Sequence, residues 1–189
     1  MKRGRDKFND FRLYIKIVTK FYGLFPKRIQ KYLLVLHRRT SGYLGLVIRY
    51  ALLKNLANSV GDNVSIQPDV YLFNLENLSI GNNVSIHSMS YIDSIGGITI
   101  GNDVSIAHGT SLISFNHKFA ELGLPIKDQG IELCPIRIES NVWIGAKANI
   151  LGGIIIGEGS IIGAGAVVTK NVKENSVFGG NPAHIIKMR

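Results

Sequence analysis

The chain has 189 residues, of which 46% are hydrophobic and 19% are charged, enough for one compact domain and an appendage. Its single cysteine, Cys134, excludes an intramolecular disulfide framework and suits a reducing compartment. The net charge of +9 is unevenly placed: residues 1–59 hold 14 Lys and Arg against two acids, whereas residues 60–189 hold eight against 11. The basic character therefore belongs to the first 59 residues.

Residues 1–59 have the pattern of a helical segment. Apolar residues recur at intervals of three and four, which places them on one helical face: Phe8, Phe11, Ile15, Val18, Tyr22 and Phe25. Basic residues fall mostly on the other side: Arg5, Arg12, Lys16 and Lys20. Pro26 starts a second stretch over 27–39, and a third covers 43–56. Within residues 1–59 the longest stretch free of Lys, Arg, Asp and Glu, 40–48, is nine residues, against the roughly 20 that a membrane span needs, and no secretory signal is expected.

Three interpretations of this basic, aromatic-rich segment remain open. It can cap the domain that follows, with its apolar face packed inward and its lysines solvated. It can attach peripherally to an anionic membrane leaflet, where each basic residue contributes about 1 kcal/mol. Nucleic-acid binding is the third, and nothing else in the chain supports it. The first two interpretations are compatible with each other.

An internal repeat dominates the rest of the chain. Three near-identical heptapeptides begin at equal spacing, at Val60, Ile80 and Ile100, and degenerate copies begin at Ile138 and Ile156. Within each copy an aliphatic residue recurs every six residues, and from Ile138 this period continues through Ile144, Ile150, Ile156, Ile162 and Val168. Such regularity indicates a stacked architecture.

Three six-residue units make one three-sided turn, so the period predicts a mainly β fold, a parallel β-helix of about five coils over residues 60–189. Aliphatic side chains would stack inside it, and Gly, Asn and Asp would form its corners. The 20-residue turns carry two extra residues at a corner, at 75–77 and 95–97. A sandwich of short strands would instead show apolar alternation with frequent turn signals.

The repeat is interrupted once, between Leu112 and Ile136. The step from Ile100 to Ile138 is 38 residues, which predicts one coil plus an inserted loop of about 20 residues, taken as 113–137. Long loops on rigid scaffolds tend to carry function. This loop contains His117, a residue type that changes protonation near neutral pH.

Several motifs from the loop onward resemble one family. The stretches NHKF, PIKDQG, NVWIGA, IGAGAVVTK and GNPAHIIK are similar to those of the hexapeptide-repeat O-acetyltransferases, the branch that modifies maltose, galactosides, streptogramins and surface polysaccharides. The resemblance covers about residues 60–189. It implies a left-handed β-helix, a homotrimer with active sites between neighbouring prisms, acetyl-CoA as co-substrate, and no required metal.

The resemblance also implies roles for individual residues. His117 matches the catalytic general base, and Asp93 aligns loosely with acidic residues that bind acceptor hydroxyls. The positions that match cofactor-binding residues are Ala146, Ala164, Thr169, Lys170 and Lys187. His184 stands where Lys or Arg is usual, and Trp143 matches a residue beside the acyl group. Cys134 is a bystander in direct transfer.

The expected function is O-acetylation of a sugar hydroxyl in bacterial surface polysaccharide synthesis, in the cytoplasm or at the inner membrane face. Antibiotic acetylation is the same chemistry on another acceptor, and a non-catalytic β-helix scaffold is a further alternative. A γ-type carbonic anhydrase needs three zinc-binding histidines. The spacing of His87, His108 and His117 lacks that enzyme's close histidine pair.

Overall fold

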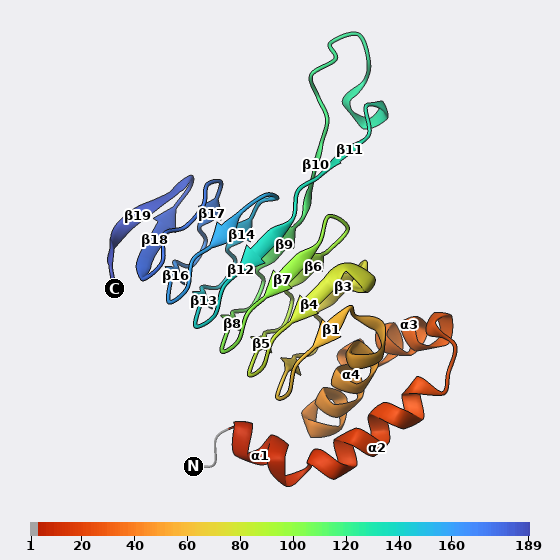
Figure 1. The fold of residues 1–189 in the computed structure, drawn as a ribbon. Helices are drawn as coiled ribbons and strands as arrows, with labels where there is room; N and C mark the ends of the chain where they lie inside the picture. Colours follow the sequence, from red (N-terminus) through yellow and green to blue (C-terminus); the bar gives the residue numbers. More distant parts are fainter. Residues whose placement is uncertain (1–3) are drawn as a thin grey trace.

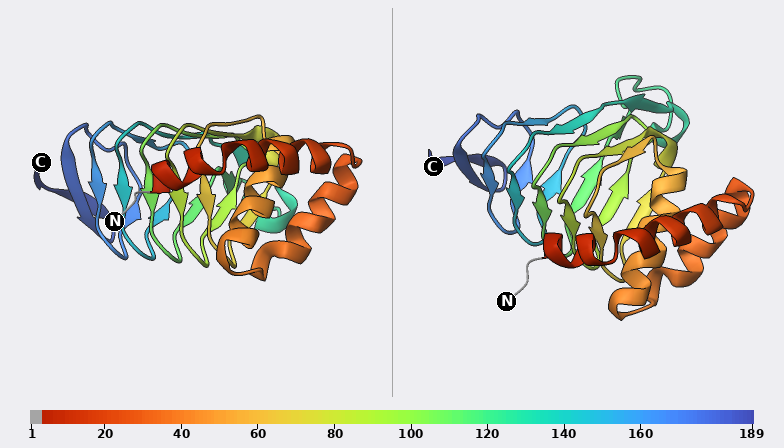
Figure 2. Two further views of the ribbon diagram at one scale, coloured as in Figure 1. Left: turned by 90° about the horizontal axis from the view of Figure 1, so that it is seen from below. Right: turned by 60° about the horizontal axis from the view of Figure 1, so that its bottom comes forward.

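The protein is described by a computed structural model that covers residues 4–189 (Figure 1). A long prism of short parallel strands forms most of the molecule, and helices cover its N-terminal end (Figures 1 and 2). The N-terminal helices are α1 (Gly4–Asp10), α2 (Arg12–Gly23), α3 (Lys27–Leu36) and α4 (Gly42–Leu56), with a 3-10 turn, η1 (His37–Arg39), between the last two. The boundaries of α3, η1 and α4 follow the predicted start of a second stretch after Pro26 and of a third near residue 43.

Three sheets form the sides of the prism. Sheet A contains β1 (Ser59–Val60), β4 (Leu78–Ile80), β7 (Ile98–Ile100), β12 (Ile136–Ile138) and β15 (Ile155–Ile156). Sheet B contains β2 (Ser65–Ile66), β5 (Ser85–Ile86), β8 (Ser105–Ile106), β13 (Trp143–Ile144), β16 (Ile161–Ile162), β18 (Ser176–Gly180) and β19 (Ala183–Met188). Sheet C contains β3 (Tyr71–Phe73), β6 (Tyr91–Asp93), β9 (Ser111–Ile113), β14 (Asn149–Ile150) and β17 (Val167–Val168). The chain visits A, B and C in turn.

Strand register confirms the repeat deduced from the sequence. The first residues of the five heptapeptides pair in one row across sheet A, in the order Val60, Ile80, Ile100, Ile138 and Ile156. The irregular step of 38 residues therefore still advances the prism by one coil. Sheets A and C have five strands each, and β18 adds a sixth coil on sheet B before β19 turns back antiparallel to it.

The aliphatic residues of the six-residue period form the core. From Ile138 to Val168 each of them is at most 1% exposed. Their neighbours Asn63, Asn83, Asp103 and Asn141 occupy one corner with φ between 55° and 59°, a left-handed conformation that Asn and Asp tolerate. The extra corner residues form a 3-10 turn, η2 (Leu75–Asn77), and a turn before β7. The residues that tolerate the corner conformation and the aliphatic residues that stack inside the prism together account for the fold.

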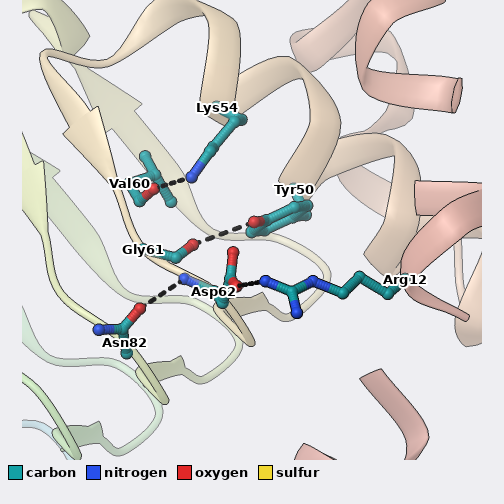
Figure 3. Close-up of polar contacts among 7 residues, drawn as sticks. All are labelled: Arg12, Tyr50, Lys54, Val60, Gly61, Asp62 and Asn82. Carbon is teal, nitrogen blue, oxygen red and sulfur yellow. Dashed lines mark hydrogen bonds and ion pairs between the residues drawn. The ribbon is translucent and has the colours of Figure 1, made fainter. Parts of the chain in front are cut away.

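Helix α4 closes the open end of the prism. It buries Ile48, Leu52, Leu53 and Leu56, and α2 and α3 pack against it. Figure 3 shows polar contacts between this cap and the first coil: the Tyr50 hydroxyl donates to the Gly61 carbonyl at 3.0 Å, and Arg12 pairs with Asp62 at 2.8 Å. Lys54 donates to the Val60 carbonyl. The helical segment thus acts as a cap, because an uncovered first coil would expose the apolar column to water.

A buried arginine connects the cap to the prism. The Arg49 guanidinium is 1% exposed and donates to the carbonyls of Ile66 at 2.8 Å, His37 at 2.9 Å and Thr40 at 2.6 Å. Its contact with Thr40 requires Gly45, because a Cβ at that position would lie 1.9 Å from the Thr40 oxygen. Burial lowers the pKa of Arg49, and the nearby Asp69 opposes this shift.

Candidate active site

The interruption of the repeat is an ordered β-hairpin. After β9 the chain leaves the prism as β10 (Phe115–His117), passes through a 3-10 turn, η3 (Ile126–Asp128), and returns as the antiparallel strand β11 (Ile131–Leu133). Figure 1 shows this hairpin projecting well away from the prism. Gln129 orders the tip, since its side chain bonds the backbone of Glu121 and Leu124 at 2.8–3.0 Å. The predicted insertion is therefore a rigid arm.

Two glycines of the prism accommodate the base of the hairpin. The Cys134 amide donates to the Ser114 carbonyl at 2.9 Å and closes the base. A Cβ on Gly96 would lie 2.0 Å from the Ser114 oxygen, and a Cβ on Gly152 would lie 2.6 Å from the Cys134 Cβ. This role is not apparent from the sequence, in which Gly96 and Gly152 each begin a Gly-Gly pair, at 96–97 and 152–153.

His117 lies at the outer end of β10, opposite Ile131, and its side chain is exposed. Its ring packs edge-to-face against Phe115, with 6.1 Å between the ring centroids. Within residues 4–189, no side chain or carbonyl forms a hydrogen bond with the imidazole. A general base is usually oriented by a second group. In a single chain the described residues therefore supply His117 with no such group.

Ala146 and Ala164 occupy one corner of the prism in successive coils. The Gly165 amide donates to the Ala146 carbonyl at 2.8 Å, which stacks the two turns directly. The side chain of Ala164 is exposed and that of Ala146 is partly so. In the described part of the chain, neither alanine's own amide N–H has an acceptor. The corner therefore presents two backbone donors, about one 4.8 Å rung apart, that a ligand can reach past small side chains.

The remaining cofactor candidates lie at the C-terminal end of the prism. Thr169 and Lys170 directly follow β17, and both are exposed. Lys187 lies on β19 opposite Val177 and is also exposed. The strands of sheet C follow one another in the order β17, β14, β9 and β6, and the chain enters the His117 hairpin after β9. The cofactor candidates therefore lie on the β14–β17 side of β9, and Asp93, on β6, lies on the other side.

The Asp93 carboxylate is partly committed to the scaffold. Its Oδ1 accepts hydrogen bonds from the Asn74 side chain at 2.7 Å and from the Ile95 amide at 3.2 Å. The residue is half-buried, and its strand β6 pairs with β9. The second carboxylate oxygen has no such bond among the described residues. Asp93 therefore has a structural role, and one oxygen is left for an acceptor.

An open groove of about 940 Å³ lies along sheet A beside the base of the hairpin, and Thr99, Leu133 and Arg137 are among its lining residues. Neither Ala146 nor Ala164 lines it, so the cofactor candidates form an open surface in the single chain. Trp143 points outward from sheet B and is 54% exposed. Across residues 4–189, no three His, Cys, Asp or Glu side chains gather as a metal site, so His87, His108 and His117 do not converge.

Comparisons with known proteins agree with this architecture. The family described as bacterial transferase hexapeptide (six repeats) matches residues 135–170. A probable acetyltransferase of Mycobacterium tuberculosis is 41% identical over 41% of this chain and 26% of its own length. A putative acetyltransferase of Schizosaccharomyces pombe is 49% identical over 35% of this chain and 32% of its own. The matched region thus spans about a third or less of these curated relatives.

Solved structures match over more of the chain. A hexapeptide-repeat acetyltransferase of Vibrio cholerae, in complex with acetyl-CoA, is 28% identical over 86% of both chains, with a TM-score of 0.76. A galactoside acetyltransferase in complex with coenzyme A is 29% identical over 86% of this chain and 80% of its own, with a TM-score of 0.69. A maltose O-acetyltransferase of Clostridium difficile is 26% identical over 96% and 87%, with a TM-score of 0.71. These matches confirm the predicted fold class, the left-handed parallel β-helix.

The resemblance to hexapeptide-repeat transferases that the motifs predicted is confirmed: the family model matches residues 135–170, and the similar proteins and structures are acetyltransferases.

Proposed function

We propose that the protein is an acetyl-CoA-dependent O-acetyltransferase that modifies a hydroxyl of a sugar. The observation that carries this proposal is the pair of unpaired backbone donors at Ala146 and Ala164, on the same prism as an arm that presents His117. The related V. cholerae structure holds acetyl-CoA, and the related galactoside acetyltransferase holds coenzyme A.

The proposed cofactor site uses backbone and cations. Carbonyl groups of the pantetheine arm would accept hydrogen bonds from the Ala146 and Ala164 amides, because methyl side chains leave the main chain accessible. Lys170 and Lys187 would face the phosphates, where charge-assisted bonds are the strongest available, and Thr169 would add a hydroxyl. His184 replaces the usual cation at one phosphate contact.

His117 would act as the general base. Its neutral imidazole removes the proton of the acceptor hydroxyl while that oxygen attacks the thioester carbonyl of acetyl-CoA, a step typically worth 10²–10⁴ in rate. The carbon–sulfur bond then breaks, and the coenzyme A thiolate takes the proton from the imidazolium. The products are an acetyl ester and free coenzyme A. Asp93 would hold an acceptor hydroxyl through its unbonded oxygen.

A homotrimer would complete the site. The hairpin presents His117 with no orienting partner, and its tip exposes Phe119 at 71% and Leu122 at 100% of their surface. Apolar side chains on a projecting arm are expected to be covered by another surface. The proposed arrangement lays the arm of one subunit against the prism of the next, where it meets that subunit's cofactor.

The proposed setting is cytoplasmic, where acetyl-CoA is made, and the proposed pathway is synthesis of a surface polysaccharide. An acceptor panel tests this choice directly. Purified protein incubated with acetyl-CoA and a sugar acceptor should release the free thiol of coenzyme A. Release only with hydroxyl-bearing antibiotics would assign the alternative acceptor. No release with any hydroxyl acceptor would refute the proposed O-acetyltransferase activity.

The role of His117 has its own test. The change His117→Ala should lower kcat by about 10²–10⁴ while leaving the acetyl-CoA dissociation constant unchanged, because a general base acts after binding. His87→Ala is the matched control, since His87 is an exposed histidine on the prism. Turnover by His117→Ala within a few-fold of the parent would refute the assignment.

A further inference from the structure

Helix α2 is apolar on two faces, and the fold accounts for only one of them. Its inner face packs on α4 through Ile15, which is 7% exposed, and through the half-buried Val18 and Tyr22. Its opposite face carries four further apolar residues that stand in solvent. They are Leu13 (74% exposed), Ile17 (58%), Phe21 (54%) and Leu24 (82%).

These four residues, called the outer stripe below, form one continuous row. Their spacing of four, four and three residues places them on the same side of an α-helix. Helix α2 is already anchored through its inner face, and all four residues stay more than half exposed, although the Phe21 ring also contacts those of Tyr22 and Phe25 at 5.5 and 5.4 Å between centroids. The cap continues the pattern on α3, where Tyr32, Val35 and Leu36 are 58–67% exposed. Contiguous exposed apolar surface of this kind marks an interaction site.

The charge beside the outer stripe indicates what it binds. Lys16 and Lys20 flank it, both are exposed, and neither is in an ion pair within residues 4–189. Residues 1–59 carry 14 Lys and Arg against two acids, whereas the rest of the chain has eight against 11. A second copy of this segment would bring like charges together, so self-association through it is disfavoured. A partner that matches both the apolar stripe and the basic charge beside it is a surface with many negative charges and an accessible apolar layer.

We propose that the outer stripe docks α2 in the plane of an anionic lipid bilayer, with the four apolar side chains in the headgroup–acyl boundary and Lys16 and Lys20 at the headgroups. Interfacial helices combine apolar and basic residues in this way. The described helices include none long and apolar enough to span a bilayer. Figures 1 and 2 show α2 on the opposite side of the molecule from the hairpin, so docking leaves His117 accessible. This surface is separate from the proposed acetyl transfer.

Vesicle co-sedimentation of the full chain tests the proposal. Vesicles of equal parts phosphatidylcholine and phosphatidylglycerol should bind the protein, vesicles of phosphatidylcholine alone should bind it much more weakly, and added salt should release it. Neutralising Lys16 and Lys20 (Lys16→Gln with Lys20→Gln) should weaken binding by roughly 25-fold, since each basic residue near the surface is worth about fivefold. Ile17→Gln with Phe21→Gln should weaken it by about tenfold or more.

Matched variants on the prism serve as controls. Met89→Gln replaces an exposed apolar residue (69%), and Lys173→Gln removes an exposed lysine, and both should bind vesicles like the parent. The far-ultraviolet circular dichroism of all variants should be unchanged, because every altered side chain is exposed. Equal binding of the outer-stripe variants and the parent would overturn the proposal, as would no binding by the parent. Loss of the native oligomer in the Ile17/Phe21 variant would overturn it too, by assigning the stripe to a subunit interface.

Discussion

The cap should depend on Arg49 far more than on any exposed ion pair. Arg49→Met keeps an unbranched apolar stem but ends short of the guanidinium, so it removes the hydrogen bonds to the carbonyls of Ile66, His37 and Thr40, which are 2.6–2.9 Å long. Hydrogen bonds from a charged group are worth about 1.5–3 kcal/mol each, and the buried carbonyls are left without a donor. Removing the cost of burying a guanidinium offsets part of this. We expect a net loss of about 3–5 kcal/mol.

The measurement is the free energy of unfolding from urea denaturation, followed by helical circular dichroism. Arg12→Met is the matched control, because Arg12 pairs with Asp62 at 2.8 Å while both side chains are about half exposed. Exposed pairs contribute roughly 0–1 kcal/mol. A loss in Arg49→Met no larger than that in Arg12→Met would show that the buried guanidinium does not hold the cap to the first coil.

Two further predictions concern Tyr50 and Gly152. Burial is the main cause that raises the pKa of Tyr50 to about 12. The folded state therefore keeps the phenol proton at a pH, near 10, at which the unfolded chain loses it. The contribution of Tyr50 to the free energy of unfolding should be fully present below pH 10 and should fall by about 2–3 kcal/mol as the pH rises toward 12. Tyr50→Phe should flatten that dependence in denaturation curves, and an unchanged slope would contradict the assignment. Gly152→Ala would put a Cβ 2.6 Å from the Cys134 Cβ, so the hairpin base must shift at about 1–3 kcal/mol and kcat should fall. Gly123→Ala, with nothing within 4 Å of the new atom, should keep the parent's kcat, and equal rates for both variants would refute a positioning role for Gly152.

The repeat made the prism predictable from sequence. Val60, Ile80 and Ile100 stack in one row because they recur at a fixed spacing and each has one side to bury. The strand pairing across sheet A has the register that this spacing predicts. The position of the insertion was equally clear, because it is the place where the period fails. The conformation of the insertion could not be predicted, because the antiparallel pairing of β10 and β11 depends on backbone geometry that no periodic pattern encodes.

The helical segment was predicted only in part. The predicted inward face is wrong at Phe11, which is 60% exposed, and the prediction that the opposite side is mainly basic missed the outer stripe. A periodicity argument selects one apolar face, and α2 has two. Arg49 could not be recognised either, since nothing in the sequence distinguishes it from Lys54, the other cation of the same largely apolar helix. Its acceptors, including the carbonyls of Thr40 and Ile66, come together only when the cap packs on the first coil.

The regular stacking of coils in the prism fixes the distance between the strand that carries the hairpin and the coils that carry the proposed cofactor donors. Successive rungs are about 4.8 Å apart, so the β9 rung that carries the hairpin lies roughly 10 Å, two rungs, from the β17 rung that follows Ala164. The hairpin nevertheless points away from its own prism (Figure 1). Rigid coils thus hold the cofactor donors in register, while the one segment that leaves the register carries the proposed base outward. A site divided in this way is complete only when a second surface meets the arm, which is the physical reason for proposing the trimer.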